Sequence, residues 1–414
     1  MFNIKVYIYY LKNIKYMVLY RYKVGDNMNI KRALKNMDKP LLFLTIFMLG
    51  FGLLNIVTSS SREAVLVNKA GVYYYFYRQM GILIASTLAA GIVFAFPTKT
   101  YKVFLPLAYV FVLGLCVVCF YQSAKRGANN WIVIGGFQVQ PSELSKPVII
   151  ASLALIFDQF YDKLKSSILN NENQVILTLV LFTGFLIPAL IFLQKDLGTS
   201  VIILGIVFTM LIFSPIASNI KKKIFILLIV VALMGALFLK ATKGSILSEA
   251  QLSRFDYINP CSKYEKNGYQ VCNAYIAFND GGVFGLGIGK SKQKYSYIPE
   301  PHTDSIFAII GEEWGVLASL AFVFVPLLAI LYRIMKIASK ANTVRGRFIA
   351  LGAGTGIFLH ILVNLGGLLG LLPLTGVPLP FLSYGGSYTL GLMISLAMVQ
   401  RVAAETKMKK IKVS

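Results

Sequence analysis

The chain alternates long apolar stretches with short segments that hold most of its charge. A helix of about 20 apolar residues spans the hydrocarbon core of a bilayer and satisfies its own backbone amides there. The stretches, with edges good to a few residues, are 41–58, 79–96, 103–120, 147–157, 174–193, 199–214, 224–239, 305–332, 348–371 and 387–404. The sequence therefore predicts an all-α polytopic membrane protein with ten transmembrane helices. Its 57% hydrophobic residues and mean hydropathy of +0.68 exclude a soluble fold.

The basic residues are divided unequally between the two sides of this topology. With the amino terminus in the cytoplasm, that side holds 26 of the 41 Lys and Arg residues but 6 of the 17 acidic residues. Such an excess is typical of cytoplasmic segments. It predicts cytoplasmic tails at 1–40 and 405–414 around a transmembrane domain at 41–404. Nucleic acid is not predicted as a partner despite the net charge of +24, because no basic stripe lies beside an aromatic platform.

The amino-terminal tail carries nine Lys or Arg in its first 39 residues, without an apolar core followed by a small-residue cleavage site. A cleaved signal peptide is therefore not predicted. The pattern favours a basic segment that lies against anionic membrane lipid, and an alternative start at Met28 is left open.

Two predicted extracytoplasmic segments are too polar to be simple turns. The larger, 240–304, connects the seventh and eighth predicted helices, and the smaller runs over 121–146. Long connections inside a compact membrane domain are usually functional or disordered. The aromatic and glycine content of 240–304 favours an ordered functional loop.

The larger loop ends in Glu300-Pro301-His302-Thr303-Asp304, directly before an apolar stretch. A carboxylate at the mouth of a membrane helix is costly to hold there unless it is paired, caps the helix or takes part in chemistry. Asp304 is therefore the first candidate for a functional residue. The alternative is that Asp304 or Thr303 caps the eighth helix.

Several motifs resemble one known family in the right order. They are NWIVIGGFQVQPSELSK (130–146), FLQKDLGTS (192–200), GGVFGLGIGKSKQKYSYIPEPHTDSIFAIIGEEWG (281–315) and PLTGVPLPFLSYGGSY (373–388). Over about 38–404 the chain resembles the SEDS proteins (shape, elongation, division and sporulation), the FtsW, RodA and SpoVE group of peptidoglycan glycosyltransferases. The Gly-Tyr-Gln sequence at 268–270 is more similar to the division branch, FtsW, than to the elongation branch.

The resemblance implies a ten-helix protein of the bacterial inner membrane that polymerises lipid II. Such proteins form β-1,4 glycan strands, release undecaprenyl pyrophosphate and depend on a divalent cation, Mg²⁺ or Mn²⁺. They act with a class B penicillin-binding protein and with other division or elongation proteins. Asp304 falls on the family's essential aspartate.

The chemistry gives an independent reason for a carboxylate at this place. Glycosyl transfer from a pyrophosphate needs a base for the attacking hydroxyl, and Asp304 is a candidate general base. A hard oxygen ligand also suits Mg²⁺ or Mn²⁺, so Asp304 is equally a candidate metal ligand. The sequence does not choose between these two roles.

Other polar residues of the outer segments are candidates for substrate binding, each with a simpler alternative. Arg254 and Lys294 either contact pyrophosphate or sugar or are solvated loop charges. Trp131 either stacks on a sugar or anchors its loop at the membrane interface. Gln140 bonds either substrate or backbone, and His302 either orients Asp304 or a sugar hydroxyl or makes local hydrogen bonds.

Two acidic residues follow Asp304 in the eighth apolar stretch. On one unbroken helix Glu312 would lie roughly 80° and Glu313 about 180° around from Asp304. Glu312 is therefore the better candidate to face a substrate cavity, and Glu313 needs a partner on another helix. A structural network is the favoured interpretation for both, and direct function is the alternative for Glu312.

Supporting roles are predicted for three charged residues. Glu143 and Lys146 lie three residues apart at a helix start, where they can form an ion pair. Asp196 is shared with the family. Two other positions depart from the family's pattern: Lys195 stands in place of a common proline and Asn130 in place of a common arginine.

Three further features complete the sequence reading. Ser305 replaces the phenylalanine that commonly follows the family's aspartate. His360 and Asn364 share one helix face and predict interhelical hydrogen bonds. Cys261 and Cys272 lie in the outer loop, where a disulfide is as probable as two free thiols.

Two rival functions are carried beside the transferase. The first is a flippase for lipid-linked precursors, because a helix break near Lys195 resembles the discontinuous helices of transporters. The second is a non-catalytic scaffold that recruits a penicillin-binding protein, for which Asp304 is dispensable. Neither gives as good a reason for an acid at the outer face.

Overall fold

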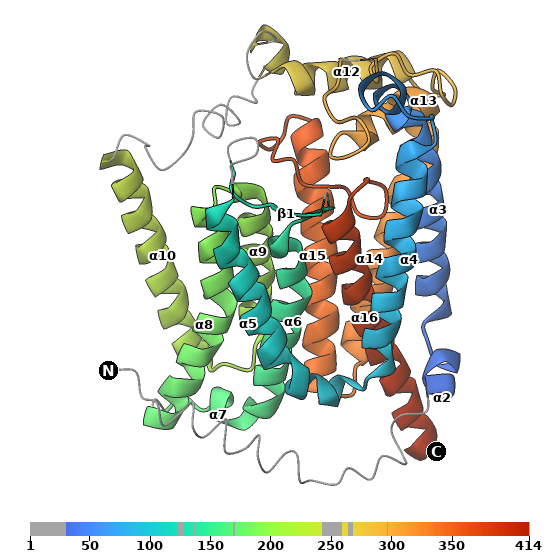
Figure 1. The fold of residues 1–414 in the computed structure, drawn as a ribbon. Helices are drawn as coiled ribbons and strands as arrows, with labels where there is room; N and C mark the ends of the chain where they lie inside the picture. The colour runs from blue at the N-terminus through green and yellow to red at the C-terminus, as the bar shows by residue number, and fades with distance from the viewer. Residues whose placement is uncertain are drawn as a thin grey trace.

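The computed structural model describes residues 30–122, 128–135, 137–168, 170–241, 259–263, 268–295 and 297–413. Long helices stand side by side in an upright bundle, and a shorter helix, α12 (Tyr269–Gly281), lies across one end (Figure 1). We call this the α12 end and the other the opposite end. A two-stranded antiparallel hairpin of β1 (Ile132–Ile134) and β2 (Phe137–Val139) lies toward the α12 end.

Six helical segments of the described residues are long and apolar enough to cross a bilayer. They are α3 with the π-helical turn η1 (Lys39–Arg62, Glu63–Val67), α4 (Tyr74–Ala95), η2 with α5 and η3 (Thr98–Thr100, Tyr101–Val118, Cys119–Tyr121), α8 (Asn171–Leu193), α13 with η6 and α14 (Ile306–Ser319, Leu320–Phe324, Val325–Lys340), and α15 (Val344–Leu368). The chain is thus an all-α polytopic membrane protein, as the sequence predicts.

The remaining four predicted spans fall on helices that are not among these six segments. They are α6 (Pro141–Gln159), α9 (Leu197–Phe213), α10 (Ser218–Ala241) and α16 (Gly386–Val413). The count of ten spans therefore stays a prediction. Helix α16 also continues through 405–413, most of the predicted carboxyl-terminal tail.

Helix α15 forms the centre of the bundle, and glycines let its neighbours approach closely. A Cβ at Gly352 would lie 2.8 Å from the Ile150 side chain of α6, and one at Gly356 would lie 3.2 Å from Ile206 of α9. On α16, a Cβ at Gly391 would lie 2.6 Å from the Glu143 carbonyl of α6. Small residues at such contacts are typical of packed membrane helices. They bring the polar residues of α6, α9, α15 and α16 within reach of one another.

At the opposite end, Asp38 joins three helices. Its carboxylate caps α3 by accepting from the Leu41 amide at 3.0 Å and pairs with Arg333 of α14 at 2.5 Å. Its backbone exchanges hydrogen bonds with the Gln400 side chain of α16. A second ion pair, Arg345 to Asp158 at 2.8 Å, joins the start of α15 to the end of α6. Short helices α2 (Ile30–Lys35) and α7 (Tyr161–Lys165) lie at this end (Figure 1).

The eighth predicted span is broken at Gly315, which corrects the single helix expected from the sequence. Gly315 has φ 74° and ψ 179°, and loop residues 282–287 fill the break. The Leu286 and Gly287 amides donate to the carbonyls of Glu312 and Glu313, at 2.9 and 3.0 Å. Asp304 lies in the turn before α13, so the helical angles predicted for Glu312 and Glu313 are wrong.

Candidate active site

Asp304 lies half-buried at the α12 end, in the turn that leads into α13. The Thr303 hydroxyl lies 3.2 Å from Asp304 Oδ1 and 3.0 Å from the Glu300 carbonyl oxygen, so one proton serves both acceptors. The turn is tight because Glu300 has φ 49° and the Thr303 amide donates to its carbonyl at 3.1 Å. The tight turn and the Thr303 hydroxyl therefore fix the position of this carboxylate.

The segment 373–382, between α15 and α16, forms a wall beside Asp304. Asn364 of α15 donates from Nδ2 to the Asp304 carbonyl at 2.7 Å and to the Val377 carbonyl at 2.8 Å. Gly376 has φ 74°, and a Cβ there would lie 3.5 Å from Asp304 Oδ2. Asn364 was predicted to bond another helix. It instead bonds the turn that carries Asp304 and the 373–382 segment, and so holds the two together.

His302 is buried between aromatic rings. Its ring centroid lies 4.2 Å from that of Tyr75 and 5.3 Å from that of Tyr384, and its Nδ1 lies 3.4 Å from Glu63 Oε2. The Tyr384 amide donates to the His302 carbonyl at 2.9 Å. The imidazole therefore packs between α4 and the segment before α16. This agrees with the local role that was one of the two alternatives for His302.

We expect His302 to titrate far below its usual range. Burial lowers its pKa from near 6.5 to about 4, and the Glu300 carboxylate offsets only part of this effect. Between pH 4 and 6.5 the unfolded chain then binds the extra proton, so this contribution to stability, about 3 kcal/mol, is complete above pH 6.5 and lost as the pH falls to 4.

Histidine-labelled NMR can measure this titration, because the chain has two histidines. The His360→Gln variant assigns the remaining signal to His302. A midpoint near 6.5 would contradict the burial described here.

Glu312 and Glu313 face the preceding loop. Glu312 accepts from the Ser291 hydroxyl at 2.5 Å and from the Lys292 and Gln293 amides at 2.8 and 3.3 Å. Its side chain is fully buried and anchors the loop, which is the structural network favoured by the sequence, and its direct function stays a prediction.

Lys294 is buried beside these residues. Its Nζ lies 3.1 Å from Glu313 Oε1 and donates to the Gly289 carbonyl at 2.6 Å. Lys294 is therefore neither a solvated loop charge nor directed at a substrate in this structure. The partner that Glu313 requires is Lys294, on the loop before α13.

Replacing Glu312 by alanine is expected to destabilise the protein by about 2 to 4 kcal/mol, because buried donors of the 291–293 loop lose their acceptor. The melting temperature in detergent measures this change. Glu172→Ala is the matched control, since Glu172 pairs with Lys163 in an exposed position where an ion pair contributes little. Equal effects of the two substitutions would contradict the anchoring role.

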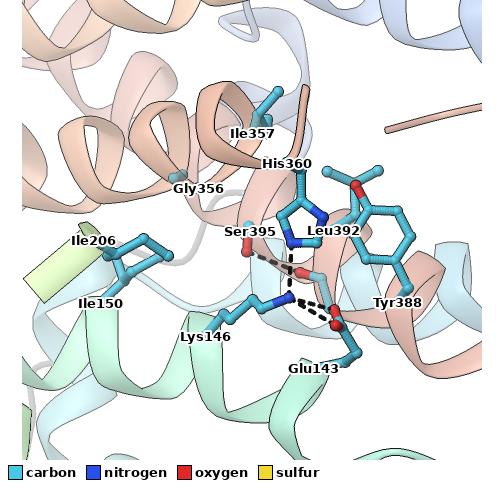
Figure 2. A pocket seen from close by; sticks show the side chains of 12 residues that line it. Glu143, Lys146, Ile150, Ile206, Gly356, Ile357, His360, Tyr388, Leu392 and Ser395 are labelled. Carbon is cyan, nitrogen blue, oxygen red and sulfur yellow. Dashed lines mark hydrogen bonds and ion pairs between the residues drawn. The ribbon is translucent and has the colours of Figure 1, made fainter. Parts of the chain in front are cut away.

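A buried ion pair lies deeper in the bundle. Figure 2 shows Lys146 of α6 pointing between Glu143 and His360, with its Nζ 2.7 Å from both Glu143 oxygens and from His360 Nε2. His360 Nδ1 lies 3.3 Å from the Pro378 carbonyl, so a neutral ring with its proton on Nδ1 satisfies both contacts. Tyr388 packs on His360 with centroids 4.7 Å apart.

This cluster lines a cavity of about 30 Å³ and reaches the same wall as Asp304. Lys146 bonds His360, and His360 reaches Pro378, next to the Val377 carbonyl that Asn364 holds. The predicted Glu143 and Lys146 ion pair is thus present. Through His360 it contacts and supports the 373–382 segment.

Asp196 caps α9 and accepts two side-chain amides. Its Oδ1 accepts from the Thr199 amide at 3.2 Å, and its Oδ2 accepts from Asn130 at 2.7 Å and Gln140 at 2.9 Å. The Gln140 side chain therefore bonds a carboxylate rather than backbone, and its role as a substrate ligand stays a prediction. Lys195, before Asp196, has φ 65°, which a proline ring could not adopt.

The other predicted residues are placed as follows. Trp131 is half-buried directly before β1. Arg254 lies outside the described residues. Cys261, in the 3-10 turn η5 (Pro260–Lys263), and Cys272 of α12 form a disulfide. Among the described residues, no group of three or more His, Cys, Asp or Glu could hold a metal ion.

Three residues that contribute to the site were not among the candidates named from the sequence. Tyr75 and Tyr384 enclose His302 from segments about 300 residues apart, and Gln270 of α12 donates to Ser305 Oγ at 2.7 Å. Asn364, by contrast, was named from the sequence, because it lies four residues after His360 on the same helix face.

The fold and site define a multi-pass helical membrane protein with a fixed, half-buried carboxylate at one end. Residues 39–408 match the family model of the FtsW, RodA and SpoVE cell cycle proteins, and the chain belongs to this family. It is 33% identical over 390 residues to the probable peptidoglycan glycosyltransferase FtsW of Bacillus subtilis (strain 168), covering 92% of this chain and 95% of the relative. It is 29% identical to the stage V sporulation protein E of the same organism, covering 88% and 96%.

Solved structures show the same fold. The rod shape determining protein RodA of Thermus thermophilus matches with a TM-score of 0.61 at 20% identity, covering 89% of this chain and 96% of that chain. A chain of a peptidoglycan synthase complex that coordinates polymerization and crosslinking matches with a TM-score of 0.68 at 22% identity, covering 89% and 98%.

Proposed function

We propose that this protein is a peptidoglycan glycosyltransferase that polymerises lipid II into β-1,4 glycan strands and releases undecaprenyl pyrophosphate. The observation that carries the proposal is Asp304, a half-buried carboxylate whose backbone is fixed by Asn364 at the end of a membrane bundle. The names of the relatives as probable peptidoglycan glycosyltransferases support the same activity.

In the proposed reaction an acceptor sugar hydroxyl attacks the anomeric carbon of the donor. The bond from this carbon to the pyrophosphate oxygen breaks as the glycosidic bond forms, and Asp304 takes the hydroxyl proton. Thr303 orients Oδ1, and Gly376 keeps the space beside Oδ2 free of a side chain. The wall at 373–382 holds this geometry because the buried ion pair and Asn364 fix it.

A divalent cation fits this site only if the substrate supplies some of its ligands. Asp304 supplies a hard oxygen, and Mg²⁺ is often held by one or two carboxylates together with phosphate oxygens. A bound cation would stabilise the charge of the departing pyrophosphate. Asp304 would be the residue that holds it, which keeps both roles of this carboxylate in the proposal.

A flippase is less well supported by the geometry. A transporter gives no reason for a fixed carboxylate at the α12 end of the bundle. A scaffold gives no reason to fix Asp304 from several elements.

We place the α12 end outside the cell and the termini and tails (1–40 and 405–414) in the cytoplasm of a bacterium, with the transmembrane domain at 41–404. The excess of Lys and Arg on the cytoplasmic side supports this orientation. A class B penicillin-binding protein and other division or elongation proteins are the proposed partners, with membrane lipid around the bundle.

The test uses the purified protein with lipid II, Mg²⁺ or Mn²⁺ and its penicillin-binding partner. Glycan polymer that disappears on chelation and returns with the cation is the expected result. Lipid II that crosses vesicles without forming polymer would overturn the proposal in favour of the flippase.

A further inference from the structure

The peptide that joins Asp304 to Ser305 is held between two side-chain amides from different helices. Asn364 of α15 donates to the Asp304 carbonyl at 2.7 Å, and Gln270 of α12 donates to Ser305 Oγ at 2.7 Å. Ser305 is fully buried and is the N-cap residue of α13. The two amides thus hold the Asp304 carbonyl and the Ser305 side chain, directly after the point where the Asp304 side chain leaves the backbone.

Gln270 lies in the first turn of α12, and this turn is held by contacts with η5. Cys272, two residues on, is bonded to Cys261 of η5, and the Cys272 amide donates to the Gly268 carbonyl at 2.8 Å. Gly268 lies so close to η5 that a Cβ would come within 1.8 Å of the Pro260 carbonyl. The disulfide therefore cross-links the first turn of α12 to η5.

The far end of α12 is held differently. A Cβ at Gly281 would lie 2.2 Å from the Gly311 carbonyl of α13, so the two backbones are in contact there. Tyr275 donates from its hydroxyl to the Leu369 carbonyl at 3.0 Å. Loss of the disulfide would therefore loosen the turn that carries Gln270 while the rest of α12 stays docked.

We propose that Gln270 is a positioning residue for Asp304 and that the Cys261–Cys272 disulfide holds Gln270 in place, so that transferase activity depends on oxidation of this cysteine pair. This inference rests on the proposed function. Gln270 acts through Ser305 and does not itself need to contact substrate.

The redox step is ordinary thiol–disulfide exchange with a dithiol reductant. One thiolate of the reductant attacks a cysteine sulfur, and its second thiol closes the reductant into a cyclic disulfide, leaving two protein thiols. Cys261 is exposed and open to attack. Cys116 and Cys119 are buried free thiols in the third predicted span and would not take part.

The first test changes Gln270 in the purified enzyme with its partner, lipid II and cation. Gln270→Ala is expected to lower kcat about tenfold with little change in KM, because a small displacement of a reacting group is costly. Gln270→Glu is expected to keep a bond to Ser305 and to move the acidic limb of the kcat profile to higher pH, since a second negative charge favours protonation of Asp304.

Asn279→Ala, at the other end of α12, is the matched control and should leave both measurements unchanged. A pH profile of Gln270→Glu identical to wild type would overturn the positioning role, even if the substitution lowered the rate.

The second test adds dithiothreitol. Reduction of wild type should lower kcat by a factor similar to Gln270→Ala, the Cys261→Ser/Cys272→Ser variant should show this lower rate with or without reductant, and Gln270→Ala should not respond. Wild type that polymerises lipid II equally well before and after verified reduction would overturn the inference alone. Oxidised wild type that makes no polymer would overturn the proposed function.

Discussion

The Asp304→Asn variant is expected to lose polymerisation of lipid II, with kcat reduced about 10³-fold or more, the range assigned to a positioned general base and its electrostatic effect. Asparagine has nearly the same shape and keeps an oxygen for the Thr303 hydroxyl, so the fold should survive. Polymer length and amount, measured with the partner and cation present, report the loss. The melting temperature in detergent should change by no more than a few degrees.

Asp280→Asn is the matched control for this experiment. Asp280 lies on α12 at the same end of the bundle, and its substitution should leave polymerisation intact. Equal polymer from wild type and Asp304→Asn would remove the proposed mechanism and leave the scaffold as the better account.

Lys146→Met is expected to be the most destabilising single substitution described here. It leaves the Glu143 carboxylate buried without its cation, and breaking one partner of a buried pair costs about 3 to 5 kcal/mol. The expected readouts are a lowered melting temperature in detergent and a poor yield of folded protein.

The double variant Glu143→Gln/Lys146→Met tests the cause of this loss. Removing both charges removes the uncompensated carboxylate, so the double variant should be more stable than Lys146→Met. A double variant that is as unstable as the single one would show that packing of the lysine chain, and not its charge, determines stability here.

The class of fold could be predicted because membrane insertion leaves its signal in local composition. Apolar length and the bias of Lys and Arg are readable without knowledge of any contact, and they gave the polytopic helical architecture. Gly315 was not predictable in the same way. The break there depends on amides of residues 286 and 287, which replace helical partners and come from a separate loop.

The candidate site could be predicted where its residues are close together in the sequence and lie on one helix. Glu143 and Lys146 are three residues apart on one helix, and their ion pair follows from that. The structural network favoured for Glu312 is present, but its partners are amides of a loop and could not be named from helical spacing. The pairing of Gln270 with Ser305 depends on how α12 crosses α13, which no local pattern encodes.

The interlock of residues 282–287 with the ends of the broken span has a mechanical consequence. Hydrogen bonds run both ways across the break, from loop amides to the carbonyls of Glu312 and Glu313 and from the Val316 and Leu317 amides to loop carbonyls. A force applied to this loop by a protein bound at the α12 end would therefore pass directly to the helical segment that begins at Val316.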